Sequence, residues 1–264
     1  MRISVILPIF NAEKFIKNSL STLTEYLKNP DLEKDLEHIQ LILVNDGSTD
    51  NTSNEINEFI DNFPTNSKFE INLISYKTNR NIGFAIKQGL QKAKNEIIII
   101  MDCDLPFKLD IINQSLELIK SCDIVSIDRT KIKGSYDVPL LRMILHKGLI
   151  LLIKLMFWKE IQGIDDFVAG FKVVKKELVD KIKNYFISDT SLIHFEIILL
   201  TQILKKVDKK QYQICFVYPH FNRETIKDTT YSFMKIVKVV LKILKDLISI
   251  KIKIKQIKKH LQWS

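Results

Sequence analysis

The chain has 264 residues, 46% of them hydrophobic, and a formal net charge of +9. This length fits one large domain or two small ones, and the apolar content excludes a disordered chain because a sizeable core can be buried. The charge is concentrated in residues 235–259, which hold nine lysines and one acid, Asp246, and such a basic segment indicates contact with the phosphates of nucleic acid or anionic lipid.

Strand and helix patterns alternate through the first half of the chain. Pro8 is expected to end the first strand, and Asn11 to cap the first helix. The alternation indicates βαβ units with right-handed crossovers, and hence an α/β fold whose mostly parallel central sheet is flanked by helices. The predicted strands are 2–9, 39–44, 69–76, 97–101 and 124–127. Helices are predicted at 15–27, at 84–94 and at 109–119, and a further helix is predicted to include residues 56–60.

The pattern is less regular after residue 129. The segment 140–158 is strongly apolar but carries four basic or histidine residues, so it is too charged for a membrane span. A buried helix and a helix on a membrane surface both remain open. Residues 165–174 predict a turn and a strand, 193–204 a helix and 213–218 a further strand.

The basic tail begins near residue 226. Its polar residues from 235 to 249 fall on one narrow helical stripe, with a broad apolar face opposite. This favours a helix that lies on an anionic membrane surface with its lysine ammonium groups among the headgroups. The alternative is a helix packed on the rest of the chain, and residues 250–255 fit either a strand or a continuation. Nucleic acid is not an expected partner, because the tail has few aromatic residues for base stacking.

The three cysteines, Cys103, Cys122 and Cys215, follow no metal-ligand or disulfide spacing, and neither do the histidines. We therefore expect a reducing compartment, without a zinc site or a disulfide framework. Residues 3–9 open directly into a strand, so no signal peptide is expected.

Two carboxylates end the most apolar strand. Asp102 and Asp104 follow the run Ile-Ile-Ile-Ile-Met at 97–101, and ligands of open α/β sheets bind at the carboxyl ends of strands. If the chain bends at Cys103, both carboxylates can reach one ion. Hard oxygen ligands suit Mg²⁺ or Mn²⁺, usually shared with substrate phosphates. The alternative is a solvated acidic turn.

A third carboxylate ends the second strand. Asp46 begins Asp-Gly-Ser-Thr-Asp at 46–50, where Gly47 permits a sharp turn and Ser48 or Asp50 can cap the following helix. Asp46 itself can hydrogen-bond the base or the ribose of a nucleotide. The first strand ends beside it, so three polar strand ends are expected to meet in one crevice.

Four motifs together resemble family 2 glycosyltransferases with the GT-A (Rossmann-like) fold. They are Pro-Ile-Phe-Asn-Ala-Glu at 8–13, Val-Asn-Asp-Gly-Ser-Thr-Asp at 44–50, Asn-Ile-Gly at 81–83 and Met-Asp-Cys-Asp at 101–104. Four later segments resemble the polyprenyl-phosphate branch of this family, of the dolichyl-phosphate mannose synthase type. These segments are 124–129, 166–172, 195–200 and 219–223. The resemblance implies a GT-A domain at 1–225, with a nucleotide-sugar half (1–128) and an acceptor half (129–225). A basic amphipathic membrane-associating tail, 226–264, follows.

This resemblance implies inverting transfer of a sugar from a nucleoside diphosphate sugar to a polyprenyl phosphate, such as dolichyl or undecaprenyl phosphate. The enzyme would be peripheral at the cytoplasmic face of a membrane. A divalent ion held by Asp104, with Asp102 assisting, would stabilise the charge that grows on the β-phosphate; Asp102 could instead reach the ribose. The residues implied at the nucleotide sugar are Pro8, Phe10, Asn11, Glu13, Asp46, Asp102, Arg129 and Arg223.

On the acceptor side, Arg129, Arg142 and Arg223 are candidate phosphate clamps, because arginine binds phosphate bidentately. Glu196 and Asp166 are candidate general bases and, with Asp104, the candidate catalytic residues. A lipid phosphate is already an anion and would need little help from a base. Glu196 could equally be a structural ion-pair partner, and Asp166 could simply position the nearby turn.

Two positions depart from the branch. Residues 228–232 read Asp-Thr-Thr-Tyr-Ser where the branch usually has Gly-x-Ser-Lys, and Leu-Pro follows Asp104 where many members have Gln-His. These differences affect the expected acceptor contacts and the metal ligands.

Three other functions fit parts of the sequence. The same fold could transfer a sugar to a hydroxyl of a glycan or glycolipid in cell-surface polysaccharide synthesis. A Rossmann dinucleotide enzyme lacks its Gly-x-Gly-x-x-Gly motif after the first strand. A non-enzymatic basic module on membranes gives no reason for Asp46, Asp102 and Asp104 to end strands.

Overall fold

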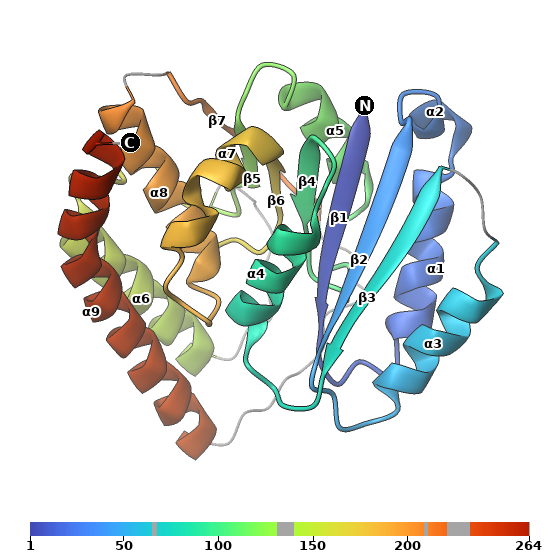
Figure 1. Ribbon diagram of the computed structural model, residues 1–264. Coiled ribbons are helices and arrows are strands. Elements are labelled where there is room, and N and C mark those ends of the chain that lie inside the picture. The colour runs from blue at the N-terminus through green and yellow to red at the C-terminus, as the bar shows by residue number, and fades with distance from the viewer. Residues whose placement is uncertain (65–67, 131–139, 209–210, 221–232, 264) are drawn as a thin grey trace.

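A seven-stranded sheet forms the centre of the molecule (Figure 1). The computed structural model describes residues 1–64, 68–130, 140–208, 211–220 and 233–263. The strands are β1 (Arg2–Ile9), β2 (His38–Asp46), β3 (Phe69–Tyr76), β4 (Ile97–Ile100), β5 (Ile124–Ile127), β6 (Lys172–Lys175) and β7 (Ile214–Val217). Their order is β3-β2-β1-β4-β6-β5-β7, and β6 alone among them runs antiparallel to its neighbours, β4 and β5.

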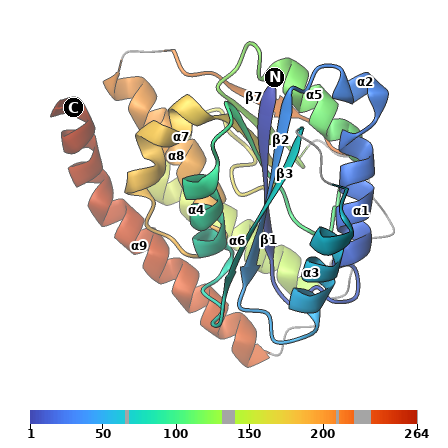
Figure 2. The same ribbon diagram turned by 45° about the vertical axis from the view of Figure 1, so that its right-hand side comes forward.

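Helices cover both faces of this sheet (Figures 1 and 2). One face carries α1 (Ile16–Leu27), α2 (Pro30–Glu33), α3 (Thr52–Asn62) and α5 (Asp110–Leu118). The other carries α4 (Ile82–Lys92), α7 (Lys176–Ile182), the short 3₁₀ helix η1 (Lys183–Tyr185) and α8 (Ile193–Val207). Outside α8 lie α6 (Leu140–Phe157) and α9 (Phe233–Trp263). The predicted α/β architecture is confirmed.

The isoleucine-rich central strand is buried on both faces, as its sequence predicted. In β4, Ile97 and Ile99 join the core under α1 and α5, and Ile98 and Ile100 join the core under α4 and α8. This alternation follows from the period of two in a strand. Both faces of β4 are covered, so its carboxyl end is the part that reaches the edge of the sheet.

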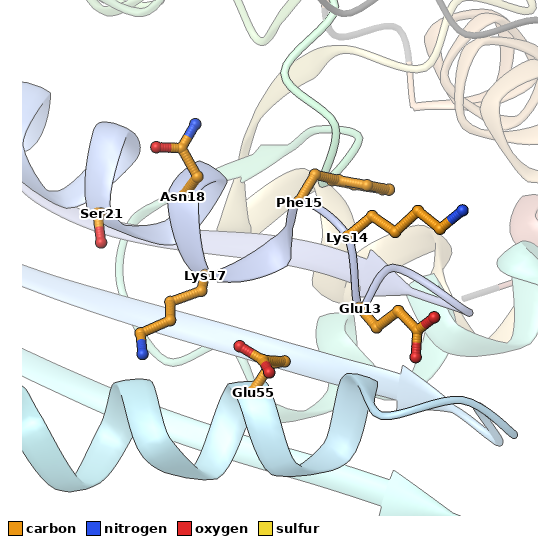
Figure 3. Close-up of a pocket in the computed structure, with 7 residues that line it drawn as sticks. All are labelled: Glu13, Lys14, Phe15, Lys17, Asn18, Ser21 and Glu55. Atoms are coloured by element: carbon orange, nitrogen blue, oxygen red, sulfur yellow. The ribbon is translucent and has the colours of Figure 1, made fainter.

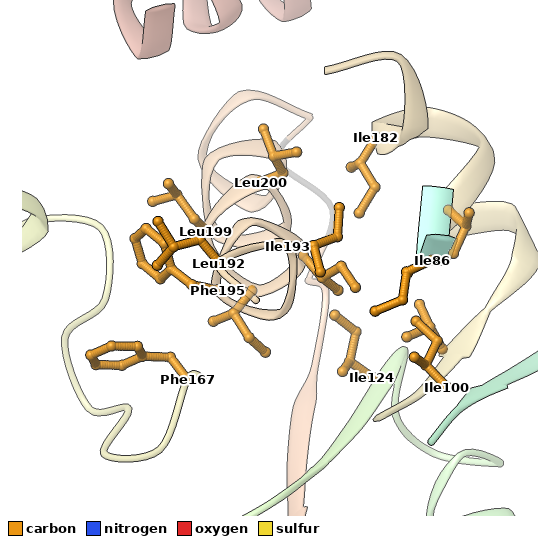
Figure 4. Packing of buried hydrophobic residues seen from close by; sticks show 14 of the residues in the cluster. Ile86, Ile100, Ile124, Phe167, Ile182, Leu192, Ile193, Phe195, Leu199 and Leu200 are labelled. Carbon is orange, nitrogen blue, oxygen red and sulfur yellow. The ribbon is translucent and has the colours of Figure 1, made fainter. Parts of the chain in front are cut away.

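Helix α8 lies inside the core on the α4 side of the sheet. Every residue from 193 to 201 is buried, and the ring of Phe195 packs 5.0 Å from that of Phe157 and 5.5 Å from that of Phe167. Figure 4 shows Phe195 and Ile193 on α8, with Phe167 on one side of the helix and the strand residues Ile100 and Ile124 on the other. A helix buried on every side needs partners all round it, and α4, α6, α7 and α9 all pack against α8.

The tail helix packs on this core with one of its sides. Leu247, Ile250, Ile254 and Ile257 of α9 are at most 7% exposed and belong to the same cluster as α8. The helix also continues through residues 250–255, so the strand considered for that segment is absent. The broad apolar face predicted from the sequence is therefore partly a packing surface for the rest of the chain.

The predicted bounds of the first strand, 2–9, are confirmed by β1, whereas the expected cap of the first helix is wrong. Pro8 does not end β1, which runs on to Ile9. The last hydrogen bond between β1 and the β4 side is donated by the Met101 N–H to the Ile6 carbonyl. Pro8 lies beyond this bond, so its missing N–H interrupts no hydrogen bond between the two strands. Asn11 does not cap α1, which begins at Ile16. Asn11 instead adopts a left-handed conformation (φ 48°) and binds the neighbouring loop.

The expectation of unpaired cysteines is also wrong. Cys122 and Cys215 form a disulfide, with their Cα atoms 6.1 Å apart and a sequence separation of 93. Cys122 lies just before β5 and Cys215 lies in β7, and these two strands are neighbours. No local spacing could reveal this pair, because the sheet brings the two positions together.

In the described part of the chain, no helix combines the length and the apolar character that a membrane span requires.

Candidate active site

The predicted site residues from different strands lie at one edge of the sheet. The strands other than β6 are mutually parallel, so their carboxyl ends meet there, and β6 begins at the same edge. Asp46 ends β2, Asp102 follows β4 and Arg129 follows β5. Since β1 lies between β2 and β4, the two acidic strand ends are separated by one strand at this edge. That they face one crevice stays a prediction.

Unusual backbone conformations gather at this edge. Among the described residues, the non-glycine residues with positive φ are Asn11 (48°), Asn81 (76°) and Leu105 (47°). Each lies in a loop that follows a strand end, and Leu105 comes directly after Asp104. Left-handed conformations are uncommon for bulky residues and concentrate at functional sites.

The loops after β1 and β2 are held together by polar contacts. The Oδ1 atom of Asn11 accepts a hydrogen bond from the Thr49 N–H (2.8 Å), and Oε2 of Glu13 accepts one from the Asn51 N–H (2.8 Å). Pro8 is buried in β1, whereas Phe10 is 44% exposed. Of these predicted nucleotide-sugar residues, Asn11 and Glu13 thus shape the loop, and Phe10 is open to a ligand.

Asp46 organises the loop before α4. Its Oδ1 accepts the Arg80 N–H (2.7 Å) and its Oδ2 accepts from Nδ2 of Asn79 (3.1 Å). Burial raises the pKa of Asp46, and the Arg80 N–H opposes this rise. Gly47 (φ +67°) fits here because a Cβ would lie 2.5 Å from the Asn79 nitrogen. The sequence did not assign this role to Asn79 and Arg80, although they precede the Asn-Ile-Gly motif.

The guanidinium of Arg80 stacks on the ring of Phe84, 3.5 Å from its centroid. This contact fixes a cation beside the loop that Asp46 holds. The loop therefore combines a planar cation with polar side chains, which suits a nucleotide.

Asp102 and Asp104 form a carboxylate pair at the end of β4. Burial, together with the negative charge of Asp104, raises the pKa of Asp102 to about 6, against the opposing charges of Arg129 and Lys172. Two carboxylates that repel each other fit a divalent cation, because the cation relieves the repulsion. In the described part of the chain, no group of three or more His, Cys, Asp or Glu side chains could hold a metal ion. Oxygens of the substrate or of water would therefore complete the coordination of a cation bound by this pair.

Lys172 is a further residue that sequence reasoning missed. It is fully buried opposite Ile100, and its Nζ donates to the Ala169 carbonyl (2.7 Å) and the Ser126 hydroxyl (3.3 Å). Burial lowers the pKa of Lys172 to about 7. A lysine between the apolar residues of Phe-Lys-Val-Val at 171–174 was the available signal.

Arg129 and Asp166 form a bidentate ion pair. Nε and Nη2 of Arg129 donate to the two oxygens of Asp166 at 2.7 and 3.0 Å, and the Arg129 backbone N–H donates as well (3.1 Å). Burial alone would raise the pKa of Asp166, but Arg129 holds it below the usual value. Such a carboxylate is a weak base. The geometry therefore favours the positioning role for Asp166, and its catalytic role stays a prediction.

Glu196 is enclosed at the start of α8. It is 1% exposed, and its two oxygens accept the backbone N–H groups of Ile187 and Ser188, both at 2.9 Å. Burial raises the pKa of Glu196 to about 7. Both oxygens hold a loop, which favours the structural alternative; its role as general base stays a prediction.

The remaining candidate arginines are not placed by the structure. Arg223 lies outside the described residues, and the side chain of Arg142, in the first turn of α6, is likewise not described. Both stay predictions as phosphate clamps.

A surface hollow of about 390 Å³ lies between α1 and α3 (Figure 3). None of the acidic residues that end β2 and β4 lines it. We therefore assign it no part in the candidate site. Its lining residues are Glu13, Lys14, Phe15, Lys17, Asn18, Ser21 and Glu55.

Comparisons with known proteins identify the family of the chain. The sequence model of Glycosyl transferase family 2 matches residues 4–183. A dolichyl-phosphate β-glucosyltransferase of Trichomonas vaginalis is 29% identical over 182 residues, which are 66% of this chain and 53% of that protein. An uncharacterized protein of Methanocaldococcus jannaschii is 28% identical over 249 residues, 90% of this chain and 96% of its own length.

A solved structure supports the fold. Glucosyl-3-phosphoglycerate synthase from Mycobacterium tuberculosis, in complex with Mn²⁺, UDP-glucose and phosphoglyceric acid, aligns with a TM-score of 0.62 at 13% identity. The alignment covers 95% of this chain and 79% of that one. The chain spans about half the length of the dolichyl-phosphate β-glucosyltransferases that it matches.

Proposed function

Because the chain belongs to glycosyl transferase family 2, we propose that it transfers a sugar from a nucleoside diphosphate sugar to a polyprenyl phosphate. The observation that carries this proposal is the convergence of Asp46, the Asp102–Asp104 pair and Arg129 at one edge of the sheet. The acceptor class is supported by the similarity to dolichyl-phosphate β-glucosyltransferases.

On the donor side, Asp46 and the loop that it holds would bind the base or ribose. Asp102 and Asp104 would hold a divalent ion, Mg²⁺ or Mn²⁺, at the diphosphate. Such an ion supplies stabilisation of the negative charge on the leaving β-phosphate. A solved structure with the same fold contains Mn²⁺ together with UDP-glucose, which supports this assignment.

On the acceptor side, the carboxylates suggested as bases support a phosphate acceptor. Both oxygens of Asp166 accept from Arg129, and both oxygens of Glu196 accept from backbone N–H groups. A hydroxyl acceptor needs a base to remove its proton, whereas a phosphate is already an anion. Attack on the side of the sugar opposite the leaving diphosphate would invert the anomeric carbon.

Arg129 would contribute to phosphate binding at this edge. Its side chain is 32% exposed, and Asp166 fixes the orientation of its guanidinium. A fixed guanidinium binds phosphate with less loss of side-chain freedom than a mobile one. Arg142 and Arg223 are retained as further candidates.

We place the enzyme at the cytoplasmic face of a membrane as a peripheral protein, with residues 1–225 as the GT-A domain and 226–264 as the membrane-associating tail. The support is the two-sided character of α9. One side packs on the core, and lysines such as Lys245 and Lys253 are exposed on the others.

Two measurements test this function. A thermal-shift panel of nucleotide sugars, with Mg²⁺ or Mn²⁺, identifies the donor, because a true donor stabilises the fold by mass action. The labelled donor is then incubated with polyprenyl phosphate, and labelled lipid is expected. Transfer to a sugar hydroxyl with no labelled lipid would reject the phosphate acceptor.

The metal role has a matched control. Asp104→Ala should abolish transfer, whereas Asp61→Ala, which removes an exposed carboxylate on α3, should not. Full activity of Asp104→Ala would remove the metal role.

A further inference from the structure

Exposed large apolar side chains gather on two helices. Within the described ranges eleven such side chains are exposed, and eight of them lie on α6, directly after it, or on α9. Large contiguous apolar patches are rare on soluble monomers and mark interaction surfaces. The eight are Ile144, Leu151, Leu155, Trp158, Val239, Leu241, Ile248 and Ile252.

The outer side of α6 is an apolar stripe. Leu151, Leu155 and Trp158 are 59%, 71% and 63% exposed and recur every three or four residues. Ile153 and Phe157, on the opposite side, are fully buried. The helix contains no acidic residue. A side that faces water in a soluble protein is normally polar, so this stripe needs an apolar partner.

The outer side of α9 is apolar and cationic. Leu241, Ile248 and Ile252 are exposed along it, with Lys245 between them. The one acidic residue of this helix, Asp246, points away from this side, toward the loop between η1 and α8. There its Oδ2 atom accepts a hydrogen bond from the Ser188 hydroxyl (2.6 Å). Further exposed lysines of this helix are Lys238, Lys251, Lys253 and Lys259.

The two helices lie side by side. Nζ of Lys251 donates to the Met156 carbonyl and lies 5.0 Å from the ring centroid of Phe157, and Lys258 forms an ion pair with Glu160 (2.8 Å). Figure 1 shows both helices outside α8, with their N-terminal ends toward the carboxyl edge of the sheet. The two stripes therefore belong to one outer layer that reaches the end of the molecule where the candidate site lies.

We propose that the outer sides of α6 and α9 form one docking surface for an anionic lipid bilayer. Leu151, Leu155 and Trp158 enter the boundary between headgroups and acyl chains, and the lysines of α9 bind lipid phosphates. This inference rests on the proposed function, because a polyprenyl phosphate acceptor resides in a membrane. A second copy of the chain is a poorer occupant, because it would set one lysine-rich side against another.

Trp158 provides a direct probe of the proposed insertion. The chain has two tryptophans, Trp158 and Trp263, so Trp263→Phe leaves Trp158 as the single reporter. On addition of vesicles of phosphatidylcholine and phosphatidylglycerol, Trp158 emission should shift to the blue, and brominated lipids should quench it. Pure phosphatidylcholine vesicles should give a weaker response, and salt should reduce binding.

Two pairs of substitutions separate the apolar and cationic parts. Leu151→Gln with Leu155→Gln should lower vesicle partitioning about tenfold or more at every lipid composition, because it removes inserted apolar surface. Lys245→Gln with Lys253→Gln should lower it by a similar factor on anionic vesicles alone. Leu73→Gln, on the edge strand β3, is the matched control and should change nothing.

The outcomes distinguish this surface from the proposed function. Unchanged Trp158 emission with vesicle-bound protein would overturn the role of α6. Dimerisation that protects Trp158 in the absence of lipid would assign the surface to a second copy instead. Transfer to a short-chain, water-soluble polyprenyl phosphate needs no bilayer. If that transfer persists without vesicle binding, this inference alone fails; if vesicles bind without transfer, the proposed function alone fails.

Discussion

Gly170 and Asp102 are in direct contact at the carboxyl edge of the sheet. A Cβ on Gly170 would lie 2.6 Å from Oδ2 of Asp102. The contact arises because β6 inserts antiparallel between β4 and β5, which brings the turn before Lys172 against the end of β4. A glycine at this position therefore decides where one of the two candidate metal ligands lies.

Gly170→Ala is expected to lower kcat about tenfold or more while the fold is retained. The added methyl group displaces the Asp102 carboxylate, and small displacements of a reacting group are costly. Gly148→Ala is the matched control, because nothing lies within 4 Å of a Cβ at that position in α6. Kinetics and thermal unfolding of both variants test this, and equal kcat values for the two would contradict it.

Asp102→Asn and Asp104→Asn are each expected to remove the metal-dependent part of donor binding. An amide carries no charge and binds Mg²⁺ or Mn²⁺ far more weakly than a carboxylate. Calorimetric titration of the donor with Mn²⁺, and again with a chelator, measures this dependence. Wild-type affinity that is unchanged by the chelator would show that binding needs no metal.

The sequence predicted the strand ends and the acidic residues well, because both are local patterns. The run of isoleucines defines β4, and Asp102 and Asp104 follow it directly. What could not be predicted depends on contacts between distant segments. Asp166 binds Arg129 across 37 residues, and Asn11 binds the loop at Thr49 instead of capping α1.

The tail shows the same limit in another form. Its amphipathic pattern predicted a helix with two different sides, and the structure has such a helix. The pattern could not tell which apolar residues would pack on the domain. Ile250 and Ile254 are buried, whereas Ile248 and Ile252 are exposed.

Arg129→Ala is expected to lower the free energy of unfolding by about 2 to 4 kcal/mol at neutral pH, because it leaves the buried carboxylate of Asp166 unpaired. Pairing holds the pKa of Asp166 below its unfolded value of about 3.9, so the contribution is present above that pH and is lost as the pH falls. Urea unfolding of both proteins at neutral and acidic pH should show the difference shrink in acid. A constant difference would contradict this account.

Asp246→Ala is expected to loosen α9 and to weaken donor binding. Its Oδ2 accepts from the hydroxyls of Ser188 and Thr190, and the adjacent Asp189 carbonyl accepts the Gly83 N–H at the start of α4. Loss of two hydrogen bonds to a carboxylate costs about 1 to 3 kcal/mol here. Gln256→Ala, which changes an exposed side chain of the same helix, is the control. Limited proteolysis of the tail and the donor KM measure the effect, and no difference between the variants would refute it.

Reduction of the Cys122–Cys215 disulfide is expected to lower the unfolding temperature without changing the fold. The bond closes a loop with a sequence separation of 93. In the chain-entropy account, closing a loop of this length stabilises the folded protein by about 4.6 kcal/mol. Cys103, the third cysteine of the chain, is not part of this bond. Thermal unfolding with and without dithiothreitol tests this, with Cys215→Ser as the control that should not respond. A Cys215→Ser protein that still loses stability with dithiothreitol would assign the effect to another site.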